Sequence, residues 1–253
     1  MHDHLNAHFG YLARSIAGGS ASRRPWGLVV DSGLDCDTFN VVVSDEAAAA
    51  PSRREASAAV DGFGGRAFSW WVGPEAPQEL ATRLVETGLA PSRPEPAMSL
   101  DLAQAPGGTA PDALHIARVS TSSELAAYAR LLAGLWSPPD ANVVRFYETA
   151  MPAALSPAAP LVLLLGMAGG EAVATAEVTL GADGVAGLYN VATVAERRRL
   201  GFGAAMTAAA ISTAKACGMR RLELQSSDDG LRVYERAGFR RFGDWTEFQL
   251  PWR

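Results

Sequence analysis

Residues 190–203 read NVATVAERRRLGFG and join an apolar segment to an alanine-rich one. The arginines at 197–199 precede Gly201 and Gly203, at the point where a helix is predicted to begin. Glycine lets a backbone approach a ligand closely, and the first N–H groups and the dipole of a helix attract anions. The stretch therefore predicts a phosphate or diphosphate site between a strand and a helix.

Glycines at such a junction also occur in loops of different kinds. The simplest alternative is a strand-to-helix turn in which the glycines have only a conformational role and no ligand binds. A dinucleotide-binding fingerprint requires a third glycine where Met206 stands, and a nucleoside-triphosphate loop requires Gly-Lys-Ser/Thr, which this stretch lacks.

The segments around this junction predict a regular succession of elements. Strands at 161–165, 172–180 and 185–193 are separated by glycine-rich turns, which is typical of antiparallel hairpins. Helical periodicity and caps predict helices at 123–134, 141–153, 201–217 and 228–237, and further strands at 114–119, 221–225 and, as a closing pair, within 239–250. The order is β-α-α-β-β-β-α-β-α-β-β.

The N-terminal half predicts a smaller mixed α/β unit. Its expected strands are 26–30, 39–43, 67–72 and 97–102, with a helix at 77–88. Residues 45–57 read as a loop that can be mobile, and the Gly-Phe-Gly-Gly at 62–65 reads as a flexible turn. The turn-rich stretch 102–112 is expected to be a linker, which divides the chain into domains at 1–101 and 113–253.

Composition narrows the class of protein. A net charge of -5 and a pI of about 5.4 disfavour nucleic-acid binding and suit a cationic small substrate. Cys36 and Cys217 have no metal-site or disulfide spacing, so we expect reduced thiols in the cytoplasm and no metal. No leader or membrane span is expected. His2, His4 and His8 lie within the first eight residues and only His115 lies near the C-terminal half, which argues against a histidine triad. A metal site formed by His2 and His4 is the alternative to a frayed, solvated terminus, which is the favoured interpretation.

The stretch at 190–203 resembles the Arg/Gln-x-x-Gly-x-Gly/Ala signature of GCN5-related N-acetyltransferases (GNAT). A second stretch, 227–239, resembles that family's Tyr-x-x-x-Gly-Phe helix end, with Tyr234 as its tyrosine. The resemblance runs from about residue 114 to residue 253. It implies an α/β (α+β) fold with a mixed, mostly antiparallel central sheet flanked by helices, preceded by a smaller, degenerate GNAT-like domain that has neither motif.

The resemblance also implies a donor site for acetyl-CoA. Backbone groups of the bulged strand would pair with pantetheine, and the loop and first helical turn would hold the diphosphate. Tyr234 would protonate the departing CoA thiolate as a general acid. Ser227 stands where an asparagine often contacts CoA, which weakens that contact; Ala195 and Gly230 are further departures. The implied cofactor-binding residues are Val191, Ala192, Thr193, Arg198, Arg199, Leu200, Gly201, Phe202, Gly203, Ala204 and Ser227.

The acceptor side is less determined. Glu177 is the leading candidate for the general base, because a carboxylate inside an apolar strand must face solvent or a cleft, although a purely structural role explains it equally well. Glu148, Asp228 and Asp229 compete with it. Residues where the family builds its acceptor wall are candidates for substrate binding: Trp136, Phe146, Tyr147 and Asn190.

The expected activity is transfer of an acetyl group from acetyl-CoA to a primary amine of a small molecule, amino acid or peptide, by direct attack. Two alternatives stay open: a catalytically silent acyl-CoA-binding module, and an N-acyltransferase that uses a longer acyl-CoA or carrier-protein thioester. Tyr234 and the intact loop favour catalysis. The protein is expected to be a monomer or a homodimer.

Overall fold

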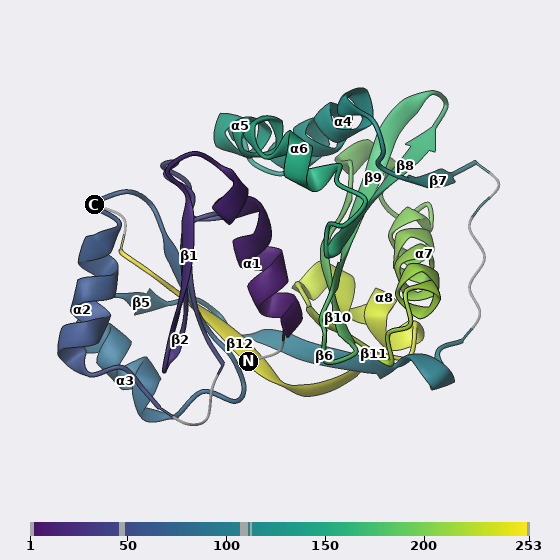
Figure 1. The fold of residues 1–253 in the computed structure, drawn as a ribbon. Helices are drawn as coiled ribbons and strands as arrows, with labels where there is room; N and C mark the ends of the chain where they lie inside the picture. The colour runs from purple at the N-terminus through teal and green to yellow at the C-terminus, as the bar shows by residue number, and fades with distance from the viewer. Residues whose placement is uncertain (1–2, 46–48, 107–110, 112, 252–253) are drawn as a thin grey trace.

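The computed structural model describes residues 3–45, 49–106, 111 and 113–251. The strands form two β-sheets that share one strand, in the order β1-β2-β3-β4-β12-β6-β11-β10-β9-β8-β7, with β5 beside β12. Each sheet has its own helices, and helix α1 lies between the two (Figure 1). The halves of the chain are therefore joined through both a strand and a helix.

The C-terminal sheet carries the hairpins that the glycine-rich turns predict. Every neighbouring pair in it is antiparallel except β10 and β11, which are parallel. The mixed, mostly antiparallel sheet is therefore confirmed. Its strands are, in spatial order, β7 (His115–Arg118), β8 (Leu161–Ala168), β9 (Glu171–Leu180), β10 (Val185–Thr193), β11 (Arg221–Gln225), β6 (Glu95–Asp101) and β12 (Arg240–Gln249).

Helices cover both faces of this sheet. On one face, α7 (Phe202–Ala216) and α8 (Asp228–Arg236) bury an apolar layer that includes Leu188, Met206 and Tyr234. The other face carries α4 (Ser122–Ala133), α5 (Ala141–Thr149), the short α6 (Met151–Ala154) and α1 (Asp3–Ser15). Alternate residues of β9 and β10 therefore point toward either α7 or α1.

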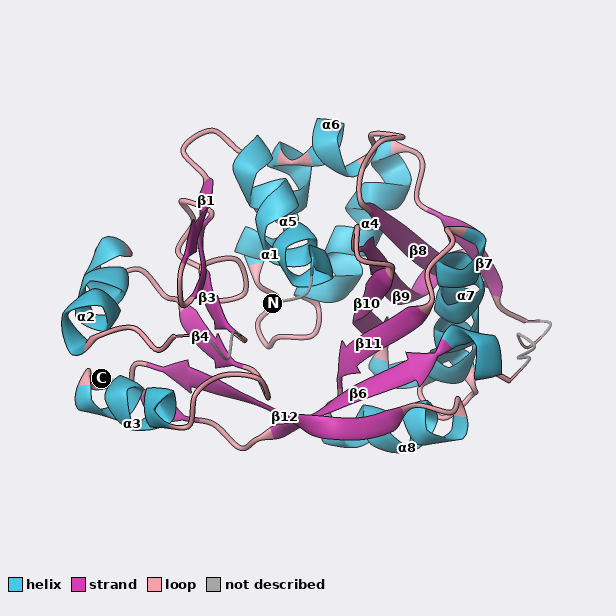
Figure 2. Cartoon of the chain, turned by 60° about the horizontal axis from the view of Figure 1, so that its bottom comes forward, coloured by secondary structure: helices cyan, strands magenta, loops and turns pink. Residues whose placement is uncertain are grey.

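The N-terminal sheet is smaller and packs on its own helices. It consists of β1 (Ser20–Arg24), β2 (Gly27–Asp31), β3 (Val41–Ser44), β4 (Ser69–Val72), the end of β12 and β5 (Ala90–Pro91). Helices α2 (Arg53–Gly62) and α3 (Glu79–Glu86) cover an apolar layer centred on Trp70, Leu80 and Phe248. Strand β12 continues from one sheet into the other (Figure 2).

Strand β6 bears on the expected division at residues 102–112. It precedes that stretch in the chain, yet it pairs with β11 on one side and β12 on the other. The described part of the stretch begins with a single 3₁₀ turn, Leu102–Gln104. The division into domains stays a prediction. Strand β6 lies before the predicted boundary in the chain, but it belongs to the sheet formed mainly by residues after that boundary.

Three expectations about elements were wrong. Residues 3–15 form helix α1 rather than a frayed terminus, because Leu5, Leu12 and Ala13 are buried. Helix α2 begins at Arg53, inside the expected loop, where Ser52 and Glu55 form a reciprocal capping box. The closing segment is one strand, β12, rather than a pair. His2 lies outside the described residues.

No helix in the described part of the chain is long and apolar enough to cross a membrane. Within the same residues, no group of three or more His, Cys, Asp or Glu side chains is placed to hold a metal ion. Cys36 is buried, Cys217 is exposed, and both are free thiols.

Candidate active site

Strands β10 and β11 separate in the middle of the C-terminal sheet. They pair only at Val185–Gly187, opposite Arg221–Glu223, although β10 continues to Thr193. The β9–β10 register shifts between Tyr189 and Ala192, and Asn190 there has a φ of 53°. A bulge with a residue in the left-handed region bends its strand away from a neighbour. On the side of β11, backbone groups of β10 beyond the bulge therefore face an opening, while Ala192 and Thr193 still pair with β9 on the other side.

The predicted anion loop lies next to this opening. Arg199 and Gly201 have positive φ values of 63° and 83°, and α7 begins at Phe202 without a side-chain cap. First-turn N–H groups of a helix have no partner within the helix, so here they are available to an anion. Arg197, Arg198 and Arg199 are exposed beside them. The residues present therefore fit a diphosphate.

Side chains around the loop support this arrangement. The Nε of Arg198 donates to the Thr193 carbonyl at 3.3 Å, which connects the loop to the end of β10. Gly203 is half-buried, and the nearest side-chain atom to a Cβ added there would be Thr193 Oγ1 at 4.0 Å. Leu200 is exposed and Phe202 is buried in the core beneath. Ala204 is exposed on the first turn.

Tyr234 lies on α8 at the same face of the sheet. It is 7% exposed and packs edge-on against Phe239, with 5.8 Å between ring centroids. Burial raises the pKa of the Tyr234 phenol to about 12. A Cβ added to Gly230 would lie 2.7 Å from Tyr234 Cε2, so the glycine leaves room for the ring. The Ser227 hydroxyl caps α8 by accepting from Gly230 N at 3.3 Å.

Glu177 lies on the face of the sheet that α1 covers, and it pairs with Tyr189 in the β9–β10 register. It is 2% exposed and accepts hydrogen bonds from the Thr179 hydroxyl at 2.7 Å and the Asn190 amide at 3.0 Å. Its Oε1 also lies 2.7 Å from His8 Nδ1. Burial opposes ionisation, but the charge and hydrogen bond of His8 and the other two contacts outweigh it, so the pKa of Glu177 is lowered. The carboxylate is shielded rather than open to a cleft.

Of the other predicted candidates, only Asn190 contacts Glu177 within the described residues. Phe146 is buried and stacks on Phe39 at 3.7 Å, and Tyr147 is buried and accepts from the Asn190 amide at 3.3 Å. Trp136 is 43% exposed. Glu148, Asp228 and Asp229 are exposed on helices, and Asp228 forms an ion pair with Arg93. Of the predicted acceptor wall, Tyr147 and Asn190 contact each other, and Asn190 contacts Glu177.

Helix α1 brings to this face two histidines that were expected at a solvated terminus. His8 stacks on Tyr189, with ring centroids 3.5 Å apart and planes 5° from parallel. His4 is 3% exposed; its Nδ1 lies 2.8 Å from the Tyr189 hydroxyl and its Nε2 lies 3.4 Å from Glu223 Oε2. The apolar spacing of Leu5, Phe9, Leu12 and Ile16 is a helical signal that could have identified α1.

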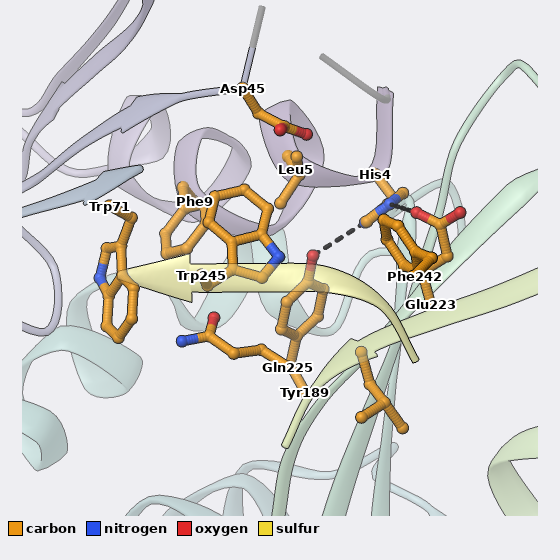
Figure 3. A pocket seen from close by; sticks show the side chains of 11 residues that line it. His4, Leu5, Phe9, Asp45, Trp71, Tyr189, Glu223, Gln225, Phe242 and Trp245 are labelled. Atoms are coloured by element: carbon orange, nitrogen blue, oxygen red, sulfur yellow. Dashed lines mark hydrogen bonds and ion pairs between the residues drawn. The ribbon is translucent and has the colours of Figure 1, made fainter. Parts of the chain in front are cut away.

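A narrow pocket opens where α1 meets the separated strands (Figure 3). Tyr189 of β10 and Glu223 of β11 lie on its two strand sides, and His4 of α1 points between them. Aromatic side chains from both halves of the chain form much of the remaining wall. The lining residues are His4, Leu5, Phe9, Asp45, Trp71, Tyr189, Glu223, Leu224, Gln225, Phe242 and Trp245.

The sequence of the C-terminal half matches the model of a known protein family. The model of the acetyltransferase (GNAT) family matches residues 116–239, just under half of the chain. The search of curated proteins finds no match.

Solved structures are similar over much more of the chain. A GCN5-related N-acetyltransferase from Kribbella flavida has a TM-score of 0.72 at 24% identity, covering 98% of this chain and 94% of that one. A GCN5-related N-acetyltransferase from Sphaerobacter thermophilus has a TM-score of 0.59 at 17% identity, covering 91% of this chain and 75% of that one. A tandem GNAT protein from the clavulanic acid biosynthesis pathway has a TM-score of 0.55 at 14% identity, covering 79% and 69%.

The similarity in fold therefore covers both halves of the chain and not only residues 116–239. Together with the family match, the parting of β10 and β11 and the glycine loop before α7, these similarities identify residues 116–239 as a domain of the acetyltransferase (GNAT) family.

Proposed function

We propose that this protein transfers an acetyl group from acetyl-CoA to a primary amine of a small molecule. Acyl transfer as such follows from the family; the donor, the acceptor class and the residue roles are our proposal. The observation that carries it is the exposed, uncapped start of α7 behind Arg199 and Gly201, next to the opening between β10 and β11.

The chain's own groups would hold the donor from two sides. Backbone N–H groups from Arg199 to Ala204 would bind the diphosphate, with the guanidinium groups of Arg198 and Arg199 beside it. Backbone groups of Val191, Ala192 and Thr193, beyond the bulge, would pair with the pantetheine as a neighbouring strand does. Bound there, acetyl-CoA would supply an acetyl group activated as a thioester.

Tyr234 would act as the general acid. In the transfer, the C–N bond forms, the C–S bond breaks and the thiolate requires a proton. A phenol whose pKa is about 12 is fully protonated at neutral pH and therefore carries a proton that it would donate to the sulfur as the C–S bond breaks. Its burial against Phe239 fixes the ring on the α7 side of the sheet.

Glu177 would position other groups of the site without contacting the amine. Its carboxylate is saturated by Thr179, Asn190 and His8, so it would hold the bulge and the His8 ring in place rather than contact the acceptor. The N-terminal half, as a degenerate GNAT-like domain, would complete the wall on the acceptor side.

The donor site is tested by binding. Acetyl-CoA should raise the melting temperature of the wild-type protein, because a ligand that binds the native state stabilises it. Gly203→Val should abolish most of the shift by placing a branched side chain in the diphosphate's path. Ser212→Val, at an exposed position of the same helix, is the matched control and should keep it. A wild-type protein that does not respond to millimolar acetyl-CoA contradicts the proposal.

A further inference from the structure

The pocket beside α1 contains a chain of three side chains that neither the family match nor the proposed donor site requires. Tyr189, His4 and Glu223 come from β10, α1 and β11 and contact one another in that order, at 2.8 Å and 3.4 Å (Figure 3). His4 is 3% and Glu223 6% exposed. Burying a polar group away from solvent costs free energy unless the group forms a hydrogen bond, and here the three groups pair with each other.

The chemistry of the three groups assigns a direction to the hydrogen bonds between them. The Glu223 carboxylate, whose other oxygen lies 3.3 Å from Arg221, is an acceptor, so His4 Nε2 carries the proton between them. His4 Nδ1 is then an acceptor and the Tyr189 hydroxyl donates to it. Burial first, and then the charges of Glu177, Glu223 and Asp45, raises the pKa of Tyr189, which keeps that hydroxyl protonated.

The backbone is shaped around this contact. Gly187 is the last residue of β10 that pairs with β11. A Cβ added there would lie 2.5 Å from His4 Nδ1 and would also collide with the Tyr189 ring. A glycine at this place therefore lets the imidazole and the phenol meet over the strand, directly at the point where β10 and β11 part.

The rest of the pocket indicates what it binds. Its walls are largely aromatic, with Phe9, Trp71, Trp245 and the 47% exposed Phe242, and its carboxylates are Asp45 and Glu223. Aromatic faces and carboxylates together attract an organic cation on an apolar body. The space between the lining side chains is narrow, which favours a small molecule over a protein segment.

We propose that this pocket is the acceptor site, an inference that rests on the proposed function. Its substrate is a small primary amine with an aromatic group. Tyr189, His4 and Glu223 together remove the proton from the amine nitrogen. The Tyr189 oxygen takes a proton from the amine nitrogen while its own proton passes to His4 Nδ1. The resulting imidazolium is stabilised by the Glu223 carboxylate. Tyr189 is the catalytic residue, and His4 and Glu223 act through it.

The first experiment concerns the substrate. 2-Phenylethylamine and glucosamine are compared as acceptors by release of free CoA thiol and by mass spectrometry of the product. We expect acetylation of 2-phenylethylamine, and an at least tenfold higher KM for it in Trp71→Ala. Acetylation of glucosamine alone, or an unchanged KM in Trp71→Ala, overturns the substrate class.

The second experiment concerns the proton path. Tyr189→Phe removes only a hydroxyl and keeps the ring stacked on His8. It should lower kcat about 100-fold, as expected for loss of a general base, while the melting-temperature shift with acetyl-CoA stays. His4→Asn should lower kcat by a similar factor, and the double variant should be no worse than either single one, because both act in one path. His115→Asn, an exposed histidine on β7, is the control.

The outcomes separate the two proposals. If the wild-type protein does not bind acetyl-CoA, the proposed function fails. If it binds acetyl-CoA and acetylates an amine, but Tyr189→Phe and His4→Asn turn over like the wild type, or their effects simply add, the proton path is wrong and the proposed function stands. A loss that appears only as a raised KM indicates a packing role and also overturns it.

Discussion

Gly230 and Tyr234 show how a single residue conditions the proposed chemistry. Glycine inside α8 lowers helix stability by roughly 0.5–1 kcal/mol relative to alanine. Here the missing methyl group leaves space for the edge of the Tyr234 ring. The glycine that departs from the family pattern therefore has a local reason, which is the position of the proposed acid.

Tyr234→Phe should lower kcat roughly 100-fold or more while the affinity for acetyl-CoA stays nearly unchanged, because only the proton donor is lost. Steady-state kinetics with calorimetric titration of acetyl-CoA measures both quantities. Gly230→Ala is the companion variant: it keeps the hydroxyl but displaces the ring, and it should also lower kcat. Normal turnover in Tyr234→Phe would remove this residue from the mechanism.

At the scale of elements, α1 is the unexpected component. It contacts β1 and β2 of one half and β9 and β10 of the other, so it lies between the two sheets (Figure 1). Leu5, Leu12 and Ala13 of α1 belong to an apolar cluster that also contains residues of β2, α4 and β8, and Leu12 is only 3% exposed. The helix is thus part of the core that joins the halves.

Leu12→Ala should lower the free energy of unfolding by about 2–4 kcal/mol, as is usual for truncating a buried leucine. Urea unfolding followed by circular dichroism measures this value. An exposed position of the same helix provides the control, and Arg14→Ala should change stability by less than about 0.5 kcal/mol. A negligible effect of Leu12→Ala would mean that α1 does not pack as described.

The sequence predicted those elements whose signals are local. Hairpin turns, helix caps and the glycines before α7 act within a few residues, so most strands of the C-terminal sheet and the glycine loop before α7 could be located from the sequence. The pairing of β6 with β11 and β12 is non-local, and no pattern within residues 95–101 specifies that partner.

The pocket that we propose as the acceptor site could not be predicted for the same reason. His4, Asp45, Trp71, Tyr189 and Glu223 lie in five separate segments and meet only when the two sheets and α1 assemble. Glu177 was predicted as a candidate because a carboxylate in an apolar strand is conspicuous. The histidine that shields it, His8, carries no such signal at a chain terminus.

At the scale of the whole molecule, β12 belongs to both sheets and carries a half-buried acidic residue, Glu247. Burial, followed by the negative charges of Asp37 and Glu95, raises the pKa of Glu247 to about 7. The unfolded carboxyl titrates near pH 4.5, so the folded state binds more protons between these values. Stability contributed by this group is therefore present below about pH 4.5 and is lost as pH rises to about 7.

Glu247→Gln removes that titration. The variant should be more stable than the wild type above pH 7, on the order of 1 kcal/mol once solvent screening is allowed for, and the difference should shrink toward pH 5. Thermal unfolding at a series of pH values measures it. A stability difference that does not depend on pH would contradict the assignment of Glu247.

The most direct measurement is acetyl transfer itself. The wild-type protein is mixed with acetyl-CoA and a panel of primary amines, and CoA thiol release is recorded together with the mass of the amine product. The proposed function predicts acetyl-CoA-dependent acetylation of at least one small amine, which Gly203→Val and Tyr234→Phe suppress and Ser212→Val leaves intact. Binding of acetyl-CoA without transfer to any amine would contradict catalysis and indicate a silent acyl-CoA-binding module.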